Sequence, residues 1–467
     1  MSDLVLIIPE LALASMAMVL ILLARRIQRT PVAAIGTVLA GTAAAVIAVW
    51  LLSWGNKTGF GGMITLDGYS QFFKVLIGAT LAVVTLLSVK SLDEEHSLRA
   101  EYHILLLLAS IGMMLAVSAH DLLPLYLSLE LMTLCSQILV GVWVGSPASN
   151  EAAVKYFLLG SFASALLIYG ISLTYGVTGA TDFAGIAFAL SHSAGNNLLL
   201  VIAIGLVAAG LAFKVAAVPF HTWAPDAYQG ASSPVAAFLA SGSKAVGLAV
   251  FGRVCLTAYG SQAELLSVIV GMLAGLSIVV GSIVALSQTD MKRMLAYSSI
   301  AHAGYALLGL IAGTPAGASA TMTYAFFYVF MTLGTFGVVV SLGKRGERLD
   351  GYRGLAVQRP GTAILMLLFL MSLTGIPPTA GFTAKFGVIL TVVRTGHIAL
   401  AILAVVCSVV SAFFYMRIVV FMYMNGPEEP ETPRLPAAIF AGLMVAALVT
   451  LIGGIAPGSL APWAVSP

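Results

Sequence analysis

Long apolar runs follow one another along almost the whole chain, separated by short polar stretches. A helix that crosses the hydrocarbon core of a membrane needs about 20 mostly apolar residues. Runs of that length recur throughout, so the pattern predicts an all-α polytopic membrane protein. The fourteen predicted spanning helices lie near residues 4–24, 31–54, 70–90, 102–119, 121–144, 153–176, 197–218, 232–256, 264–286, 294–312, 319–342, 362–390, 397–424 and 435–456.

Residues 181–192 are too few and too polar to span, and they predict a helix at the membrane surface. Composition agrees with a lipid environment, because 60% of the residues are hydrophobic and 9% are charged, against about a quarter charged in soluble domains. The net charge of +3 is small and scattered, which argues against nucleic-acid binding. The three cysteines lie in apolar helices without metal-ligand spacing, so we expect no metal, iron–sulfur cluster or disulfide in this chain.

The basic residues predict an orientation, because cytoplasmic loops concentrate Lys and Arg. If the N-terminus is outside, four basic residues fall in outside loops or helix ends, namely Lys57, Lys74, Arg253 and Arg394. This bias predicts an even number of helices with both termini outside. The basic residues that then fall in cytoplasmic loops are Arg25, Arg26, Arg29, Lys90, Arg99, Lys292, Arg293, Lys344, Arg345, Arg348, Arg353, Arg359 and Arg434.

Five basic residues remain within apolar segments. Arg417 lies near a cytoplasmic helix end, where its long side chain could reach the interface. Among the acidic residues, Glu130 is the one expected to lie deep in an apolar helix. The other four basic residues are Lys155, Lys214, Lys244 and Lys385.

An unpaired charge at the middle of a spanning helix costs about 2.5–3.5 kcal/mol on insertion scales. These side chains are therefore expected to face the interior of the bundle, with Glu130 and Lys214 as natural partners. A change in the distance between them would make the lysine bind or release a proton, which predicts proton handling. The alternative is a structural ion pair that fixes the helix register.

Two predicted helices contain prolines at membrane depth, which is tolerated where the gap lines a cavity or is buried in protein. The seventh helix breaks near Pro219 and Pro225, after Lys214, and the twelfth breaks at Pro377 and Pro378, before Lys385. Breaks at corresponding positions are typical of inverted-repeat transporters. They predict two five-helix repeats, helices 4–8 and 9–13. The predicted divisions are residues 1–100, 101–258, 259–425 and 426–467.

Two histidines could join a proton relay, because His titrates near physiological pH. His302 lies in AYSSIAHAGYALLGL among Ser and Tyr residues, and His221 follows the first break. For His302 the alternative is a packing role with satisfied ring nitrogens. For His221, near the cytoplasmic surface, the alternative is a local structural role.

Several stretches resemble a known family, the antiporter-like membrane subunits of respiratory complex I, the proton-translocating NADH–quinone oxidoreductase. The resemblance covers about residues 66–425. The stretches that carry it are LYLSLELMTL, EAAVKYFLLGSFASALLIYG, FKVAAVPFHTWAPDAYQGASSPVAAFLASGSK, MKRMLAYSSIAHAGY and LTGIPPTAGFTAKF.

This resemblance implies that Glu130, Lys214, Lys244 and Lys385 form a proton path, with Lys155 tuning the uptake side. It implies a bacterial inner-membrane subunit with periplasmic termini and no cofactor of its own. FMN, iron–sulfur clusters, NADH and quinone would then be bound by other subunits. The implied partners are a sister antiporter-like subunit, a small membrane subunit and the lipid bilayer.

Three other functions remain open on this fold, since fold does not settle function. The first is a subunit of a cation/proton antiporter or of a membrane hydrogenase. The second is a structural subunit whose charges only hold neighbours together. A free-standing solute carrier is the third, although no substrate-sized polar cluster argues for it.

Overall fold

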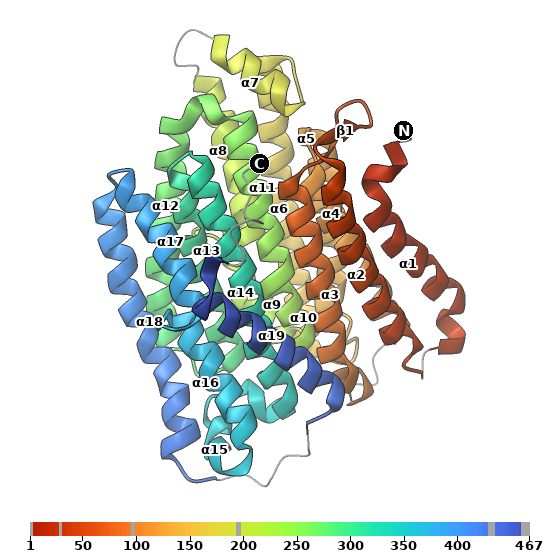
Figure 1. Ribbon diagram of the computed structural model, residues 1–467, viewed down its shortest axis with the longest axis vertical. Coiled ribbons are helices and arrows are strands. Elements are labelled where there is room, and N and C mark those ends of the chain that lie inside the picture. Colours follow the sequence, from red (N-terminus) through yellow and green to blue (C-terminus); the bar gives the residue numbers. More distant parts are fainter. Residues whose placement is uncertain (1–2, 28–29, 95–98, 193–197, 428–434, 459–467) are drawn as a thin grey trace.

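The structure of the chain is almost entirely helical, and its helices run roughly along the long axis of the molecule (Figure 1). Strand β1 (Lys57–Gly59) pairs antiparallel with β2 (Ile64–Leu66) in a short hairpin. The predicted all-α membrane fold is confirmed. This computed structural model describes residues 3–27, 30–94, 99–192, 198–427 and 435–458.

The N-terminal segment contains three long helices, as predicted, with the hairpin between the second and the third. Asp67 precedes the third helix, and its carboxylate accepts the Ser70 backbone N–H at 2.7 Å, which satisfies a free donor of the first turn. The bounds are η1 (Asp3–Ile7), α1 (Ile8–Ile27), α2 (Val32–Leu51), η2 (Leu52–Trp54) and α3 (Gly68–Glu94).

The middle of the chain contains the first predicted break and the predicted surface helix. The seventh predicted helix ends early, as α8, and the chain continues irregularly into the short α9. The eighth predicted helix is interrupted by π-helical turns, which the sequence did not indicate. The bounds are α4 (Arg99–Ser118), α5 (Leu122–Val140), α6 (Pro147–Thr178), α7 (Phe183–His192), α8 (Leu198–Val215), α9 (Trp223–Gly230), α10 (Ser233–Phe238), η3 (Leu239–Ser243), α11 (Lys244–Arg253) and η4 (Val254–Ala258).

The last part of the chain contains the second break. The predicted helix 362–390 is divided into α16 and α17, which are separated by residues 375–379. The bounds are η5 (Gly260–Gln262), α12 (Ala263–Leu286), α13 (Met291–Ile311), α14 (Pro315–Leu342), η6 (Gly343–Glu347), η7 (Asp350–Tyr352), α15 (Leu355–Gln358), α16 (Pro360–Thr374), α17 (Ala380–Arg394), α18 (Ile398–Met424) and α19 (Ala437–Ile455).

Within the described residues, thirteen helices are long and apolar enough to cross a membrane. The divided helix accounts for the difference from the predicted fourteen, because α16 and α17 have 15 residues each. The chain is therefore a multi-pass membrane protein. Breaks occur in the two predicted helices that carry proline at membrane depth.

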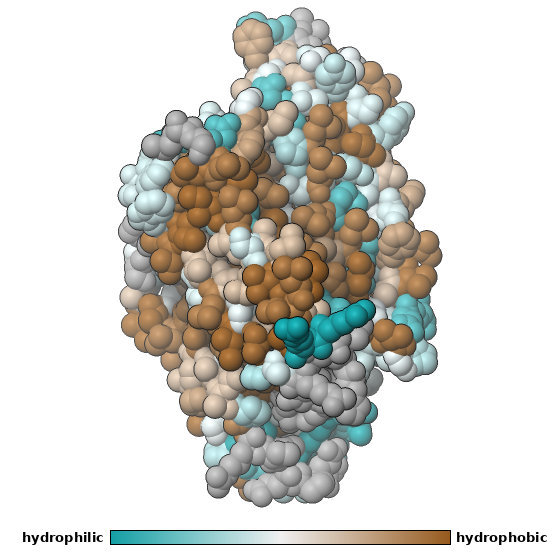
Figure 2. All heavy atoms as spheres, turned by 90° about the vertical axis from the view of Figure 1, so that its right-hand side faces the viewer, coloured by the Kyte–Doolittle hydropathy of each residue, from teal (hydrophilic) through white to brown (hydrophobic). Residues whose placement is uncertain are grey.

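The interior of the bundle is formed by the segment from α10 to η4 together with α13 and α14, whose residues are almost all buried. Helices α1, α2 and α18 bury only about a third of theirs, and many of the exposed side chains are large and apolar. Figure 2 shows hydrophobic residues over most of the middle of one face, with hydrophilic residues mostly toward the two ends. A surface of this kind suits lipid.

The basic loops come together at one end of the molecule, which we call the basic end. Asp290, in the turn before α13, forms a backbone bridge with Arg348, in the loop before α15. Helix α15 lies at this end and α7 lies at the opposite end (Figure 1). Of the basic residues assigned to cytoplasmic loops, Arg29 and Arg434 lie outside the described residues.

Candidate functional site

A carboxylate and an ammonium group meet between α5 and α8. Lys214 Nζ lies 3.4 Å from Glu130 Oε1 and donates a hydrogen bond to Thr133 Oγ1 at 2.6 Å. Glu130 also accepts a hydrogen bond from the Ser164 hydroxyl. The Lys214 side chain is 2% exposed and that of Glu130 is 23% exposed. Lys214 therefore lies in the buried interior of the bundle and Glu130 lies at the edge of that interior. Glu130 is less deeply buried than the sequence suggested.

The first break lies directly beside this pair, since α8 ends one residue after Lys214. Side chains from elsewhere satisfy backbone groups that the break leaves free. Trp223 Nε1 donates to the Phe213 carbonyl at 3.0 Å, and the Val218 N–H donates to Ser277 Oγ at 2.8 Å. Irregular backbone at this depth is tolerated because protein groups pair with it.

Lys244 is the first residue of α11 and follows the π-helical turn η3 directly. The residue is 1% exposed, and its Nζ donates to Ser299 Oγ, a neutral acceptor, at 2.7 Å. Gly247 lies one turn further on, where a Cβ would come within 2.8 Å of Val215 Cγ1 and 3.3 Å of the Lys214 carbonyl carbon. The missing side chain thus lets α8 and α11 approach closely where they carry the two lysines.

His302 lies on α13 in the bundle interior and is 3% exposed. Its Nδ1 is 2.7 Å from the Tyr324 hydroxyl, and its Nε2 is 3.3 Å from the Tyr415 hydroxyl, which also contacts the Ser298 hydroxyl. Hydroxyl groups donate and accept hydrogen bonds. Either ring nitrogen can therefore carry the proton without losing its partner, so the site suits a relay as well as a packing role.

Lys385 lies on α17, just after the second break. Its Nζ donates to the Thr374 carbonyl at 2.8 Å and to Ser408 Oγ at 3.1 Å, and it lies 4.7 Å from the centre of the Tyr305 ring. Thr374 is the last residue of α16, so its carbonyl has no later helical N–H to accept. The break thus supplies a partially negative helix end for the ammonium.

One face of α13 links these separate groups. Ser299, His302 and Tyr305 are spaced three residues apart, and side chains at that spacing are neighbours on a helix surface. Ser299 accepts from Lys244, and the Tyr305 ring lies against Lys385. His302 lies between them, so the structure brings Lys244, His302 and Lys385 into one buried row along α13.

Lys155 and His221 lie outside this row, toward the basic end. Lys155 pairs with Glu151 at 2.7 Å and with Asp226 at 3.4 Å, and its side chain is 47% exposed. His221 lies half-buried between α8 and α9, where its Nδ1 has no hydrogen-bond partner, and burial lowers the pKa of its imidazole. The structure thus places both residues at one end of the row rather than within it.

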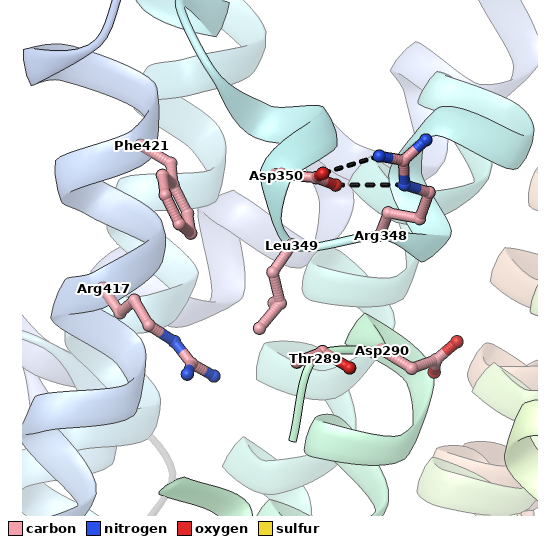
Figure 3. Close-up of a pocket in the computed structure, with 7 residues that line it drawn as sticks. All are labelled: Thr289, Asp290, Arg348, Leu349, Asp350, Arg417 and Phe421. Atoms are coloured by element: carbon pink, nitrogen blue, oxygen red, sulfur yellow. Dashed lines mark hydrogen bonds and ion pairs between the residues drawn. The ribbon is translucent and has the colours of Figure 1, made fainter. Parts of the chain in front are cut away.

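A pocket of about 450 Å³ opens at the basic end (Figure 3). Arg348 donates to both carboxylate oxygens of Asp350 there, at 3.0 and 2.6 Å, and these bonds hold the pKa of Asp350 below its ordinary value. Arg417 donates to the carbonyls of Leu286 and Gln288, so its guanidinium satisfies backbone acceptors at the end of α12. The pocket is lined by Thr289, Asp290, Arg348, Leu349, Asp350, Arg417 and Phe421, none of them in the buried row.

The chain is similar to known membrane proteins over most of its length. Residues 119–411 match the family described as NADH:quinone oxidoreductase/Mrp antiporter, TM. Subunit N of the NADH-quinone oxidoreductase from Desulfovibrio desulfuricans is 43% identical, over 99% of this chain and 96% of that protein. A subunit N from Rhizobium meliloti is 44% identical, over 88% and 86%. This chain belongs to the NADH-quinone oxidoreductase subunit N family.

Solved structures agree with this membership of the subunit N family. A chain of respiratory complex I from Thermus thermophilus, solved with bound aureothin, superimposes with a TM-score of 0.85 at 32% identity, covering 98% of this chain and all of that one. A chain of the Mrp complex from a Dietzia species has a TM-score of 0.88 at 22% identity, over 99% and 96%. At that lower identity the likeness shows a shared fold alone.

Sequence reasoning missed a second buried pair in this member of the subunit N family. Lys74 Nζ lies 2.7 Å from Glu10 Oε1, with side chains 0% and 3% exposed. The expectation that Glu130 alone lies deep was therefore wrong, and so was the placement of Lys74 at an exposed helix end. Glu10 lies three residues into α1, so its sequence position suggested the interface, and its burial and its pairing with Lys74 on α3 appear only in the tertiary structure.

Two further basic residues that were assigned to loops or helix ends are also buried. Arg253 is 2% exposed and pairs with Asp67, and Lys292 is 4% exposed and pairs with Glu347 at 2.8 Å. Both lie within two residues of a helix end, where charge is ordinary in sequence. A partly buried acidic partner from a distant segment distinguishes these two residues from ordinary helix-end charges. A local sequence pattern does not contain that information.

Proposed function

We propose that this chain is a proton-translocating membrane subunit of an NADH–quinone oxidoreductase, and that protons move along its buried row of ionisable side chains. The observation that carries the proposal is the order of these groups in the bundle. The Glu130–Lys214 pair lies where α8 approaches α11, and Lys244 on α11 contacts Ser299 on α13. On the same face of α13 follow His302 and then Tyr305, whose ring contacts Lys385. Each lysine has at least one neutral hydroxyl acceptor. A charge with such partners can leave or return at a smaller cost than a charge locked in a tight ion pair.

The Glu130–Lys214 pair is the proposed switch. At an effective dielectric constant of about 20, two unit charges about 4 Å apart attract by about 4 kcal/mol, and doubling the distance halves that energy. The observed separation of 3.4 Å leaves the pair close but not in its tightest contact. A modest movement of α5 relative to α8 would thus change whether Lys214 keeps its proton or passes it to Lys244.

Lys385 is the proposed last residue of the path, and it would pass protons on toward the far side of the membrane. His302 and the hydroxyls around it would connect it with Lys244. Lys155, paired with Glu151 and Asp226 at the basic end, would tune proton uptake. His221 is the weakest member, since its position between α8 and α9 also suits a local structural role.

The rest of the proposed assembly follows from the names of the relatives, which are subunits of NADH-quinone oxidoreductases. Other subunits would bind NADH, FMN, iron–sulfur clusters and quinone, and this chain would hold no redox centre. It would lie in a bacterial inner membrane beside a sister antiporter-like subunit and a small membrane subunit. The distribution of Lys and Arg supports cytoplasmic basic loops and periplasmic termini.

The test is a set of variants in the assembled complex, in sealed membrane vesicles. Lys214→Met, Lys244→Met and Lys385→Met each remove one proton carrier and keep most of the side-chain volume. We expect each to lower the number of protons moved per NADH oxidised by at least half, with the complex still assembled. Lys344→Met, at an exposed loop position, is the matched control.

An unchanged proton-to-electron ratio in all three variants would favour a purely structural role for the charges. A cation/proton antiporter subunit is the other candidate on this fold, because the family model that matches residues 119–411 covers Mrp antiporters as well as NADH:quinone oxidoreductases. Repeating the measurement with and without sodium separates the two. A sodium requirement without NADH oxidation would reject the proposed complex.

A further inference from the structure

The helix that carries Lys244 is a short α-helical segment between two π-helical turns. Helix α11 has ten residues, Lys244–Arg253, and π-helical turns lie on both sides of it, η3 before and η4 after. A π-helical turn contains one extra residue and wider hydrogen bonds, and it often occurs at functional sites. Regular α-helical hydrogen bonding is therefore interrupted at both ends of α11, and contacts with other helices contribute to its position.

The outer end of α11 is fastened to the start of α3. Arg253 donates two hydrogen bonds to the Asp67 carboxylate, at 2.8 and 2.9 Å, and its guanidinium lies 4.9 Å from the centre of the Tyr69 ring. The Tyr69 hydroxyl donates to the Ala249 carbonyl, one turn earlier on α11, at 2.8 Å. These contacts fix two successive turns of α11. They therefore restrict rotation of the helix about its axis and translation along that axis.

Asp67 itself is held firmly. Its carboxylate accepts the Ser70 backbone N–H at the first turn of α3, and the side chain is 17% exposed. A bidentate pair between an arginine and a carboxylate fixes the orientation of the guanidinium as well as stabilising it. Among the residues that the structure describes, the buried guanidinium pairs with no other carboxylate, so losing Asp67 would leave it poorly satisfied.

We propose that Asp67 and Tyr69 are positioning residues, which fasten α11 at its outer end and thereby hold Lys244 against Ser299. A helix of ten residues is about 15 Å long and rigid on that scale. A shift or rotation at Arg253 is therefore transmitted to Lys244 at the other end. The N-terminal three-helix segment then contributes to proton transfer indirectly, because α3 helps to position Lys244. None of the described residues of this segment belongs to the buried row.

This inference rests on the proposed function of Lys244, so its test needs a readout that does not depend on pumping. Hydrogen–deuterium exchange of residues 239–253 in the purified, assembled complex supplies it. Hydrogen bonds to charged groups contribute about 1.5–3 kcal/mol, so Asp67→Asn should speed exchange in this segment by about tenfold or more. Tyr69→Phe, which removes one neutral hydrogen bond, should have a smaller effect in the same segment.

The matched control is the other buried pair of the same helix. Glu10→Leu combined with Lys74→Met removes a pair that ties α3 to α1 instead of α11, and an apolar replacement of a buried ion pair is often neutral. We expect normal exchange in residues 239–253 and a normal proton-to-electron ratio in this variant. Asp67→Asn should lower that ratio and shift its pH profile, which a general loss of stability would not do.

Unchanged exchange of residues 239–253 in Asp67→Asn overturns the inference, and so does an equal acceleration in the Glu10/Lys74 control. Faster exchange with an unchanged proton-to-electron ratio also overturns the proposed task in proton transfer. Lys244→Met identifies the source of such a result. If that variant also leaves the ratio unchanged, the proposed function of Lys244 has failed and the fastening of α11 still stands.

Discussion

One hydroxyl group accepts a hydrogen bond from each of Lys214, Lys244 and Lys385, and the contact to Lys214 is the shortest of the three. Thr133 Oγ1 accepts from Lys214 Nζ at 2.6 Å, whereas the Glu130 oxygen is 3.4 Å away. A buried ammonium group needs hydrogen-bond acceptors at close range. The Thr133 hydroxyl therefore stabilises the charged form of Lys214 together with the Glu130 carboxylate. The threonine is therefore part of the proposed switch.

Replacing Thr133 tests this point. Thr133→Val keeps the shape and removes the acceptor, and a hydrogen bond to a charged group contributes about 1.5–3 kcal/mol, so proton translocation should fall by about tenfold. Thr133→Ser keeps the hydroxyl and should retain most of the activity. The measurement is the initial rate of proton uptake by vesicles at a matched rate of NADH oxidation. Equal rates in the two variants would show that the hydroxyl is not needed.

Asp67 leads to a prediction about pH. Burial alone would raise the pKa of this carboxyl, but the Arg253 charge and hydrogen bonds hold it below the ordinary value of 3.8. The stabilisation from the pair is therefore complete above that value and is lost only as the pH falls below it. After correction for the intrinsic exchange rate, deuterium uptake of residues 239–253 should be constant between about pH 5 and pH 8. A rise in uptake within that range would contradict the assignment.

At the scale of elements, the second break is held together by close backbone contact. Gly381, in the first turn of α17, donates its N–H to Ser372 Oγ at 3.0 Å. A Cβ at this position would lie 1.7 Å from the Ser372 carbonyl oxygen, whereas a Cβ at Gly387 on the same helix would meet nothing within 4 Å. The half-helices α16 and α17 can therefore meet only because residue 381 has no side chain.

Gly381→Ala and Gly387→Ala form a matched pair of variants on α17. Overpacking typically costs about 1–3 kcal/mol and more where backbone must move, so Gly381→Ala should lower the amount of assembled complex several-fold. Gly387→Ala should leave it unchanged, because the helix gains a better helix former in open space. Blue-native electrophoresis of solubilised membranes measures both. Similar assembly in the two variants would show that the α16–α17 contact is dispensable.

The sequence predicted most of the spanning helices, but it predicted only some of the places where a helix is interrupted. The prolines at 219 and 377 indicated where the chain leaves helical geometry, because proline lacks a donor. The π-helical turn before Lys244 carries no proline, and residues 239–243 (LASGS) are small residues of a kind that is common in membrane helices. The five-helix inverted repeats and the divisions at residues 100, 258 and 425 stay predictions.

At the scale of the whole molecule, the orientation in the membrane can be tested with the two ends of α12. Ser261 and Ser287 lie just outside opposite ends of this helix and both are exposed. Ser261→Cys should react with an impermeant thiol reagent added from the periplasmic side, and Ser287→Cys from the cytoplasmic side. The three native cysteines are buried, so their background should be low. The reverse pattern would invert the topology.

The sequence by itself determined that lipid surrounds most of this protein, and it predicted which loops face the cytoplasm. Apolar runs of spanning length and the uneven distribution of Lys and Arg are local properties, so they can be read without a fold. The presence of Glu130, Lys214, Lys244 and Lys385 deep in such runs was visible for the same reason. A charge among twenty apolar residues has no local explanation.

Only the tertiary structure decided which of these charges meet and which other charges are buried. Glu10 with Lys74 and Asp67 with Arg253 join segments far apart in the chain, and each residue alone resembles an ordinary helix-end charge. Lys155, by contrast, lies in an apolar run yet stays half-exposed. The physical reason is that burial and pairing depend on the neighbours brought by packing, whereas the sequence specifies only the residue and its helix.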